Sequence, residues 1–243
     1  DADDGGDADD GGDADDGGDA DDGGDDGDDI AFDLVFSLDS ESTTAGEPVA
    51  FSLTWTGDDG STSDVTSYAI TSDTEESITV EESSLTVTVA AAHTLTVTAT
   101  SPYGDEASAT ATLNVDAAST AVLYLSLSED EVTAGESVEA TISAEDAFGN
   151  ETPSDGATLT SSDAVSVDGS TLLVTIAGSY TATATLGDIV AEASWSVIAG
   201  EAVSVDLVLE DTDLDVGDDT DYEVFALDAY GNPTAASDIR IWA

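Results

Sequence analysis

The sequence predicts an all-β fold in which small β-sandwich domains follow one another behind a disordered acidic tail. Two observations support this prediction. From Ile30 onward, Val, Thr, Ser, Ala and Leu alternate with a period of two, which is typical of strands with one buried face. Related segments also recur in the same order along the chain, which indicates a repeated domain. No stretch has a sustained helical period.

The acidic tail comprises residues 1–29. Four copies of Asp-Ala-Asp-Asp-Gly-Gly precede Asp-Asp-Gly-Asp-Asp, and this low-complexity stretch carries 16 Asp. It has no apolar residue larger than Ala, so it cannot bury enough surface to offset the entropy of ordering. An EF-hand loop needs a third acid where this repeat has Gly5, and a distal Glu that is missing here. We therefore expect the tail to be a disordered, solvated spacer without a defined calcium site, and loose condensation of cations on it is the alternative.

Six later segments show the alternation most clearly, and each is predicted to be a strand with one face inward. They are 49–55, 95–99, 109–115, 138–144, 180–186 and 191–197. In this phase Trp55 and Trp195 point inward, so we expect both to be core residues rather than platforms for stacking on sugars. Trp242 lies in an unfinished repeat and is not assigned a role.

A short glycine motif begins each repeat. Thr-Ala-Gly-Glu-Pro-Val at 44–49 matches Thr-Ala-Gly-Glu-Ser-Val at 133–138, and Asp-Val-Gly-Asp-Asp-Thr at 215–220 is a weaker third copy. In each copy the Gly ends an acidic turn and precedes the second strand of the repeat.

A second turn motif follows that strand. Asp-Ala-Phe-Gly-Asn at 146–150 matches Asp-Ala-Tyr-Gly-Asn at 228–232, and the first repeat has the weaker Gly-Asp-Asp-Gly-Ser at 57–61. Glycine suits the positive backbone angles of such turns, and the Asp can bond nearby amides.

The spacing of the two motifs predicts three domains after the tether, at 30–117, 118–199 and 200–243. The linkers between them are only a few residues long. Short linkers favour a semi-rigid rod over independently tumbling domains.

These motifs resemble the bacterial immunoglobulin-like domains of invasin- and intimin-type surface proteins, and also filamin-type repeats. The resemblance covers residues 30–243, and is strongest over 121–199 and 203–242 and weaker over 30–117. It implies tandem immunoglobulin-like sandwiches. It also implies a surface-exposed spacer, stalk or adhesive array in which binding usually belongs to other domains, an inference by analogy because this fold hosts many functions.

The third domain is short. It supplies about three strands and stops directly after Ile239, Ile241 and Trp242. Half a sandwich exposes its apolar face and unpaired edges. We expect the natural chain to continue beyond residue 243, and poor order or completion by a partner are the alternatives.

The charge of the chain restricts its partners. Its 56 acids face Arg240 as the only Lys or Arg, for a net charge of −55. Such a chain repels nucleic acids and anionic membranes and attracts cations. No apolar run is long enough to insert into a membrane. Acids are abundant outside the tail as well, which indicates either a halophilic source or an exported protein with an acidic surface.

We expect no catalytic, cofactor-binding or metal-ligating residues and no required cofactor. The chain has no Cys, and His93 is its only histidine, so a Ser-His-Asp triad would depend on His93 and zinc would lack ligands. A lone His at the start of a strand is typically a turn or edge residue. Calcium between domains is a separate hypothesis, based on the acidic clusters Glu129–Glu131 and Glu210–Asp215 near the junctions.

Phe148 and Tyr230 occupy matching turn positions. We expect each ring to fold back over the end of its own sandwich, and contact with a neighbouring domain or a partner is the alternative. Asn150-Glu151-Thr152 is a formal N-glycosylation acceptor, relevant only in an organism that glycosylates such sites.

The sequence therefore predicts a non-catalytic stalk or adhesion module, exposed on the cell surface or secreted, on a flexible acidic tether. The alternative is an accessory region of a larger secreted enzyme that binds carbohydrate or protein, which exposed aromatic residues in a groove would favour. In either case the macromolecular partners are surface polysaccharide or protein. A lipid anchor would lie upstream of Asp1, and the chain contains no Met.

Overall fold

The computed structural model describes residues 31–74, 78–213 and 215–234. The tether predicted over 1–29 and the residues around Trp242 lie outside this described part. Strands and turns make up the described residues, without any helix, so the all-β prediction is confirmed. Within the same ranges no helix is long and apolar enough to cross a membrane.

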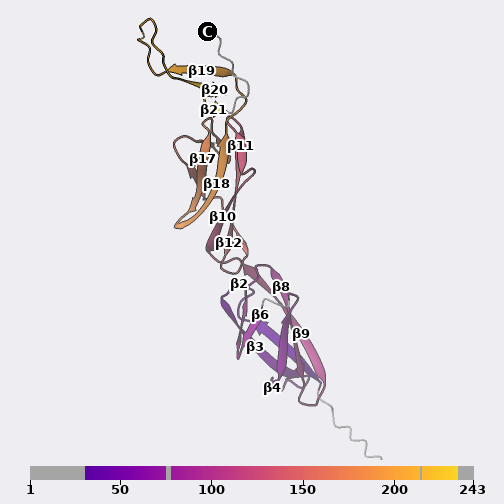
Figure 1. The fold of residues 1–243 in the computed structure, drawn as a ribbon. Coiled ribbons are helices and arrows are strands. Elements are labelled where there is room, and N and C mark those ends of the chain that lie inside the picture. Colours follow the sequence, from indigo (N-terminus) through magenta and orange to yellow (C-terminus); the bar gives the residue numbers. More distant parts are fainter. Residues whose placement is uncertain (1–30, 75–77, 214, 235–243) are drawn as a thin grey trace, which may run out of the picture.

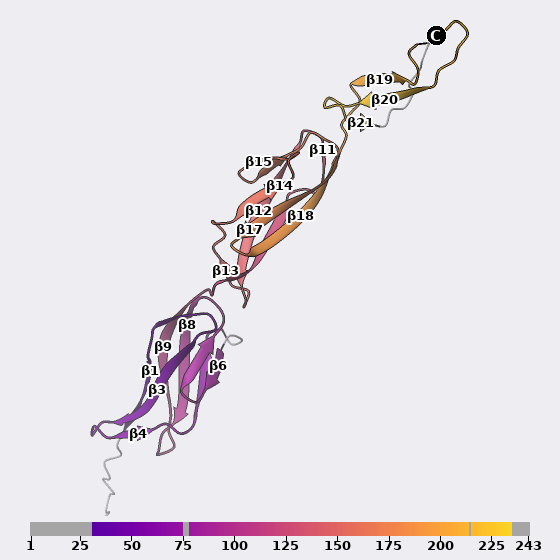
Figure 2. The same cartoon turned by 90° about the vertical axis from the view of Figure 1, so that its left-hand side faces the viewer.

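Two β-sandwiches and a smaller sheet stand end to end along the molecule (Figures 1 and 2). We call them the first sandwich, made of β1–β9, the second sandwich, made of β10–β18, and the third sheet, made of β19–β21. Each sandwich packs a five-stranded sheet on a four-stranded sheet. This is a tandem immunoglobulin-like architecture.

The first sandwich has one sheet ordered β1-β3-β7-β6, with β4 beside β3, and another ordered β2-β9-β8-β5. The short strand β2 runs parallel to β9, whereas the other described pairs of this sandwich are antiparallel. The strands are β1 (Phe32–Leu38), β2 (Ser42–Thr44), β3 (Pro48–Gly57), β4 (Thr62–Asp64), β5 (Tyr68–Ser72), β6 (Ile78–Glu81), β7 (Ser84–Val87), β8 (Ala92–Thr100) and β9 (Glu106–Asp116).

The second sandwich repeats this topology. Its sheets are ordered β10-β12-β16-β15, with β13 beside β12, and β11-β18-β17-β14, and β11 runs parallel to β18. The strands are β10 (Thr120–Leu127), β11 (Glu131–Thr133), β12 (Ser137–Asp146), β13 (Glu151–Thr152), β14 (Thr158–Ser161), β15 (Ser166–Asp168), β16 (Thr171–Leu173), β17 (Gly178–Leu186) and β18 (Ile189–Ile198). The two sandwiches are copies of one fold, as the recurring motifs predict.

Alternating apolar residues build a separate core in each sandwich. Trp55 on β3 is 1% exposed and Trp195 on β18 is 3% exposed, so both are core residues, as predicted. The Trp195 ring lies 5.6 Å from that of Tyr180 on the neighbouring strand β17. Because each core closes within its own strands, contacts between the sandwiches are left to the loops at their ends.

The third sheet has one face uncovered by any described residue. In the second sandwich Leu123 pairs with Ala144 and is 5% exposed, in a cluster with Ala184 of the opposite sheet. Val205 pairs with Ala226 in the same register, yet Val205 is 60% exposed. The three strands are β19 (Ser204–Leu209), β20 (Tyr222–Leu227) and β21 (Pro233–Thr234). That the chain continues beyond residue 243 stays a prediction.

Candidate functional site

The turn after β12 lies at the junction between the two sandwiches. It is closed by two backbone bonds, from the Asp146 N–H to the Asn150 carbonyl at 2.9 Å and from the Gly149 N–H to the Asp146 carbonyl at 3.2 Å. Three of its side chains contact either the first sandwich or the linker. We call this arrangement the first clasp, formed by Asp146, Phe148 and Asn150 with Gly46, Thr88, Ala90 and Ala118.

Asn150 bridges the junction through both ends of its side-chain amide. Its Oδ1 accepts from the Ala90 N–H at 2.8 Å, and its Nδ2 donates to the Thr88 carbonyl at 2.8 Å. Nδ2 also donates to Asp146 Oδ2 at 2.8 Å. A glycan on Nδ2 would replace one of these hydrogens, so use of the formal glycosylation acceptor is incompatible with the intact clasp.

The Asp146 carboxylate ties the turn to the linker. It is 2% exposed. Its Oδ1 accepts from the N–H groups of Phe148 and Asn150 at 2.8 and 2.9 Å, and its Oδ2 accepts from the Ala118 N–H at 2.8 Å. Burial raises the pKa of Asp146, but the hydrogen bonds from the Asn150 side chain and from these three backbone N–H groups outweigh it and lower the pKa to about 2. The carboxylate is therefore held as the anion.

Phe148 places its ring on the backbone of the first sandwich. Gly46 has a φ of +84°, and a Cβ added there would lie 2.6 Å from Phe148 Cε2. The expectation that this ring folds over its own sandwich is wrong, and the alternative, contact with a neighbouring domain, is correct. The reason is that the turn faces the neighbouring sandwich, where a glycine leaves room for a ring.

The second clasp repeats these contacts at the junction between the second sandwich and the third sheet. Asn232 accepts from the Ala177 N–H and donates to the Thr175 carbonyl, both at 2.8 Å. Asp228 accepts from the Gly200 N–H of the linker at 2.9 Å. The corresponding residues are Asn232 for Asn150, Asp228 for Asp146, Tyr230 for Phe148, and Gly135 for Gly46.

Tyr230 and Asp228 match their counterparts in chemistry as well as position. A Cβ on Gly135 would lie 2.5 Å from Tyr230 Cζ, so this ring also contacts the neighbouring unit rather than folding over its own. Burial raises the pKa of Asp228, but bonds from the Asn232 side chain and from the N–H groups of Gly200, Asn232 and Tyr230 outweigh it and hold the pKa well below its usual range. At both junctions the aromatic residue of one motif thus contacts the glycine of the other motif in the preceding unit.

The corresponding turn of the first sandwich has the same backbone without the clasp side chains. The Gly57 N–H donates to the Ser61 carbonyl at 2.8 Å, and the Gly60 N–H donates to the Gly57 carbonyl at 2.9 Å. However, Gly57, Asp59 and Ser61 stand where the clasps have Asp, an aromatic residue and Asn. This turn therefore lacks the clasp side chains, and no sandwich precedes it among the described residues.

His93 is fully buried, so the expectation of a turn or edge residue is wrong. It lies within β8, in the same inward phase as Leu95, and is 0% exposed. Its Nε2 lies 2.7 Å from the Val89 carbonyl, and its Nδ1 lies 2.8 Å from Thr74 Oγ1 and 3.2 Å from Ser72 Oγ. Because both ring nitrogens have partners, the imidazole can be buried at little cost.

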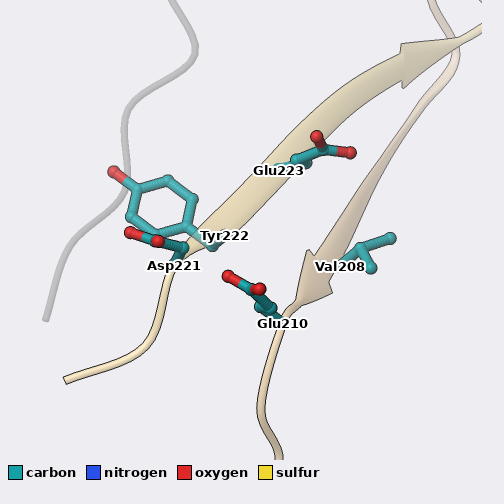
Figure 3. Close-up of a pocket in the computed structure, with 5 residues that line it drawn as sticks. All are labelled: Val208, Glu210, Asp221, Tyr222 and Glu223. Atoms are coloured by element: carbon teal, nitrogen blue, oxygen red, sulfur yellow. The ribbon is translucent and has the colours of Figure 1, made fainter.

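The two acidic clusters proposed for calcium lie in different units of the fold, one in the second sandwich and the other in the third sheet. In the cluster Glu129–Glu131, Glu131 accepts from the Ser196 hydroxyl at 3.2 Å. In the cluster Glu210–Asp215, Glu210 lines an open depression of the third sheet together with Asp221 and Glu223, and the Glu223 carboxylate points away from the other two (Figure 3). Among the described residues, no three His, Asp or Glu side chains are placed to hold a metal ion. The calcium hypothesis stays a prediction, as does the expected lack of catalytic and cofactor-binding residues.

The first clasp is expected to loosen in acid. The folded-state pKa of Asp146, about 2, lies below its ordinary value of 3.8, so the stability that the anion contributes is fully present above about pH 4 and is lost as the pH falls toward 2. Scattering curves recorded between pH 5 and pH 2 should show a more flexible chain at the lower end. Circular dichroism over the same range checks that the sandwiches stay folded, and an unchanged scattering curve at pH 2 would contradict the prediction.

Comparison with known proteins gives structural likenesses only. No protein-family model matches the chain, and no curated protein matches it. A solved structure of FdeC, an adhesin of Escherichia coli, is 20% identical over 83% of this chain and 76% of that one, with a TM-score of 0.47. Domains 4 and 5 of the S-layer protein SbsC are 16% identical over 70% of this chain and 99% of that one, with a TM-score of 0.32.

A third solved structure, human protocadherin-24 EC1-2, is 10% identical over 71% of this chain and 99% of that one, with a TM-score of 0.39. The fold assignment itself rests on the sheets and register described above.

Proposed function

We propose that this chain is a non-catalytic stalk of the cell surface or secreted space, in which immunoglobulin-like domains are held end to end by clasps. The observation that carries the proposal is the recurrence of the same clasp at both junctions, with the same donors, acceptors and ring-on-glycine contact. The domain boundaries predicted at 117/118 and 199/200 are part of the proposal.

The energy of a clasp is sufficient to stiffen a junction. Each Asn makes two hydrogen bonds to the preceding sandwich, and a bond between neutral groups contributes about 1 kcal/mol net. The linker already holds the two partners together, so little further entropy is lost on closing. About 2 kcal/mol then favours the closed junction roughly 30-fold.

The net charge of the chain and its resemblance to bacterial surface domains support a location at the cell surface or in the secreted space. A net charge of −55 favours an extended chain and attracts cations. The placement outside the cell follows from the resemblance of the repeats to bacterial surface domains. Surface polysaccharide or protein, as partners of the stalk or of the domains that it carries, also belong to this proposal.

The alternative, an accessory binding region of a secreted enzyme, has less support. Trp55 and Trp195 are buried, so neither can stack on a sugar. The rings of Phe148 and Tyr230 remain about half exposed, but each already lies against a glycine of the neighbouring unit. Exposed aromatic side chains that the alternative would use are Tyr103 at 66%, Tyr222 at 57% and Tyr124 at 46%. Of these, Tyr222 lines the open depression of the third sheet.

Removing the bridging Asn residues tests the proposal. Because the chain contains no Cys, cysteines introduced at Ser52, Thr141 and Asp206 in pairs can carry spin labels across each junction. We expect Asn150→Ala to broaden the distance distribution across the first junction only, and Asn232→Ala to broaden the distribution across the second only.

The matched control is Ser61→Ala, at the position of the turn in the first sandwich that corresponds to Asn150. It should leave both distributions at their original widths. If the double variant Asn150→Ala/Asn232→Ala keeps both junctions as narrow as in the unaltered chain, the clasps do not hold the rod and the proposal is wrong.

A further inference from the structure

The loop that receives each bridging Asn is itself held by a side chain of the next strand. In the first sandwich the loop joins β7 to β8 and offers the Thr88 carbonyl and the Ala90 N–H to Asn150. The carbonyl between them, of Val89, lies 2.7 Å from Nε2 of His93. Since a carbonyl only accepts, Nε2 carries the proton and donates it.

In the second sandwich a different side chain makes the same bond. Asn232 uses the Thr175 carbonyl and the Ala177 N–H. The hydroxyl of Tyr180 donates to the carbonyl between them, of Ile176, at 2.7 Å. His93 and Tyr180 each follow the accepting carbonyl by four residues. Two chemically different residues thus place a donor at one position of the fold.

Each donor is fixed by its own sandwich. His93 is 0% exposed, and its Nδ1 lies within hydrogen-bond distance of the hydroxyls of Ser72 and Thr74. The Tyr180 ring packs beside Trp195, with the ring planes inclined by 33°. This hydrogen bond therefore holds the middle of the receiving loop at a fixed place relative to the core of its own sandwich.

We propose that His93 and Tyr180 are positioning residues of the clasps. Each donor anchors the central carbonyl of the receiving loop and so sets the orientation of the peptide groups on either side of it. One of these groups must present its C=O, and the other its N–H, to the side-chain amide of the bridging Asn. The inference rests on the proposed function, because it assigns these residues a role in closing the junctions. The side chain needed at this position is a hydrogen-bond donor on a ring fixed by its own sandwich.

Tyr180→Phe in the full chain tests the proposal, because it removes the hydroxyl and keeps the ring beside Trp195. We expect the Ala177 amide hydrogen to exchange about fivefold faster, as loss of one hydrogen bond implies. The distance distribution across the second junction, between labels at Thr141 and Asp206, should broaden. The Ala90 amide and the first junction should be unchanged, and they are the internal control.

The first sandwich allows a rescue experiment. His93→Phe removes the donor, whereas His93→Tyr supplies the donor that the second sandwich uses. We expect faster exchange of the Ala90 amide and a broader first junction in the Phe variant, and values near those of the unaltered chain in the Tyr variant. Thermal unfolding of both variants shows whether the first sandwich is intact, since His93 is fully buried.

The outcomes separate this inference from the proposed function. If Asn232→Ala broadens the second junction but Tyr180→Phe leaves both the Ala177 exchange and the junction width unchanged, Tyr180 is not a positioning residue and the clasp stands. If neither variant changes the second junction, the inference and the proposed function are both overturned.

Discussion

Gly46→Ala is expected to open the first junction and leave the second one closed. The added Cβ would lie 2.6 Å from Phe148 Cε2, where no real contact is tolerated, so the ring must leave its place. The φ of +84° adds backbone strain of about 1 kcal/mol for any residue with a side chain. The measurement is the distance distribution between spin labels at Ser52 and Thr141, which should become broad.

A matched control separates the clash from the strain. Gly60 has a φ of +82° and no atom within 4 Å of an added Cβ, so Gly60→Ala carries the strain alone and should leave the junction narrow. Combining Gly46→Ala with Phe148→Ala removes the clash. The double variant should therefore recover part of the Asn150 hydrogen bonding and have a narrower distance distribution than Gly46→Ala alone. Equal effects of Gly46→Ala and Gly60→Ala on the junction would contradict this account.

Asp146→Ala is expected to cause the largest loss of stability. The carboxylate accepts four hydrogen bonds at 2.8 to 2.9 Å. Its removal leaves the N–H groups of Ala118, Phe148 and Asn150 without that acceptor in a site from which water is largely excluded. Bonds to a charged group contribute about 1.5–3 kcal/mol each and do not add fully, so we expect a loss of about 3 kcal/mol or more.

The loss should be measured by urea unfolding followed through the indole resonance of Trp195, because a chain of several domains has no single unfolding free energy. The Trp55 resonance reports the first sandwich, which should unfold at nearly its original urea concentration. Asp59→Ala is the control, because Asp59 is exposed and its carboxylate accepts from the Ser61 N–H at 2.8 Å rather than from the linker or a neighbouring unit. If Asp146→Ala and Asp59→Ala cost the same, the buried carboxylate does not have the role assigned to it.

The sequence by itself determined the strands and the turns. Alternation with a period of two is a local property, so it placed Trp55 and Trp195 in the core without knowledge of their neighbours. The same alternation puts His93 in phase with Leu95, a signal for its burial that outweighs the rule that a lone histidine lies at an edge. The recurring glycine and Asp-Ala-aromatic-Gly-Asn motifs identified the repeat for the same reason, since turn chemistry depends on a few adjacent residues.

Only the tertiary structure decided what the two motifs do together. Phe148 contacts Gly46, and Asn150 bonds to Ala90, because the ends of successive sandwiches that carry these residues face each other. No local sequence pattern specifies that arrangement. The sequence did contain one unused signal. The first sandwich follows the acidic tail and not another sandwich. Its turn at 57–61 has Gly57 and Ser61 where the clasps have Asp and Asn. Contacts between domains depend on residues distant in the chain, so they become visible once the ends of the sandwiches are placed in space.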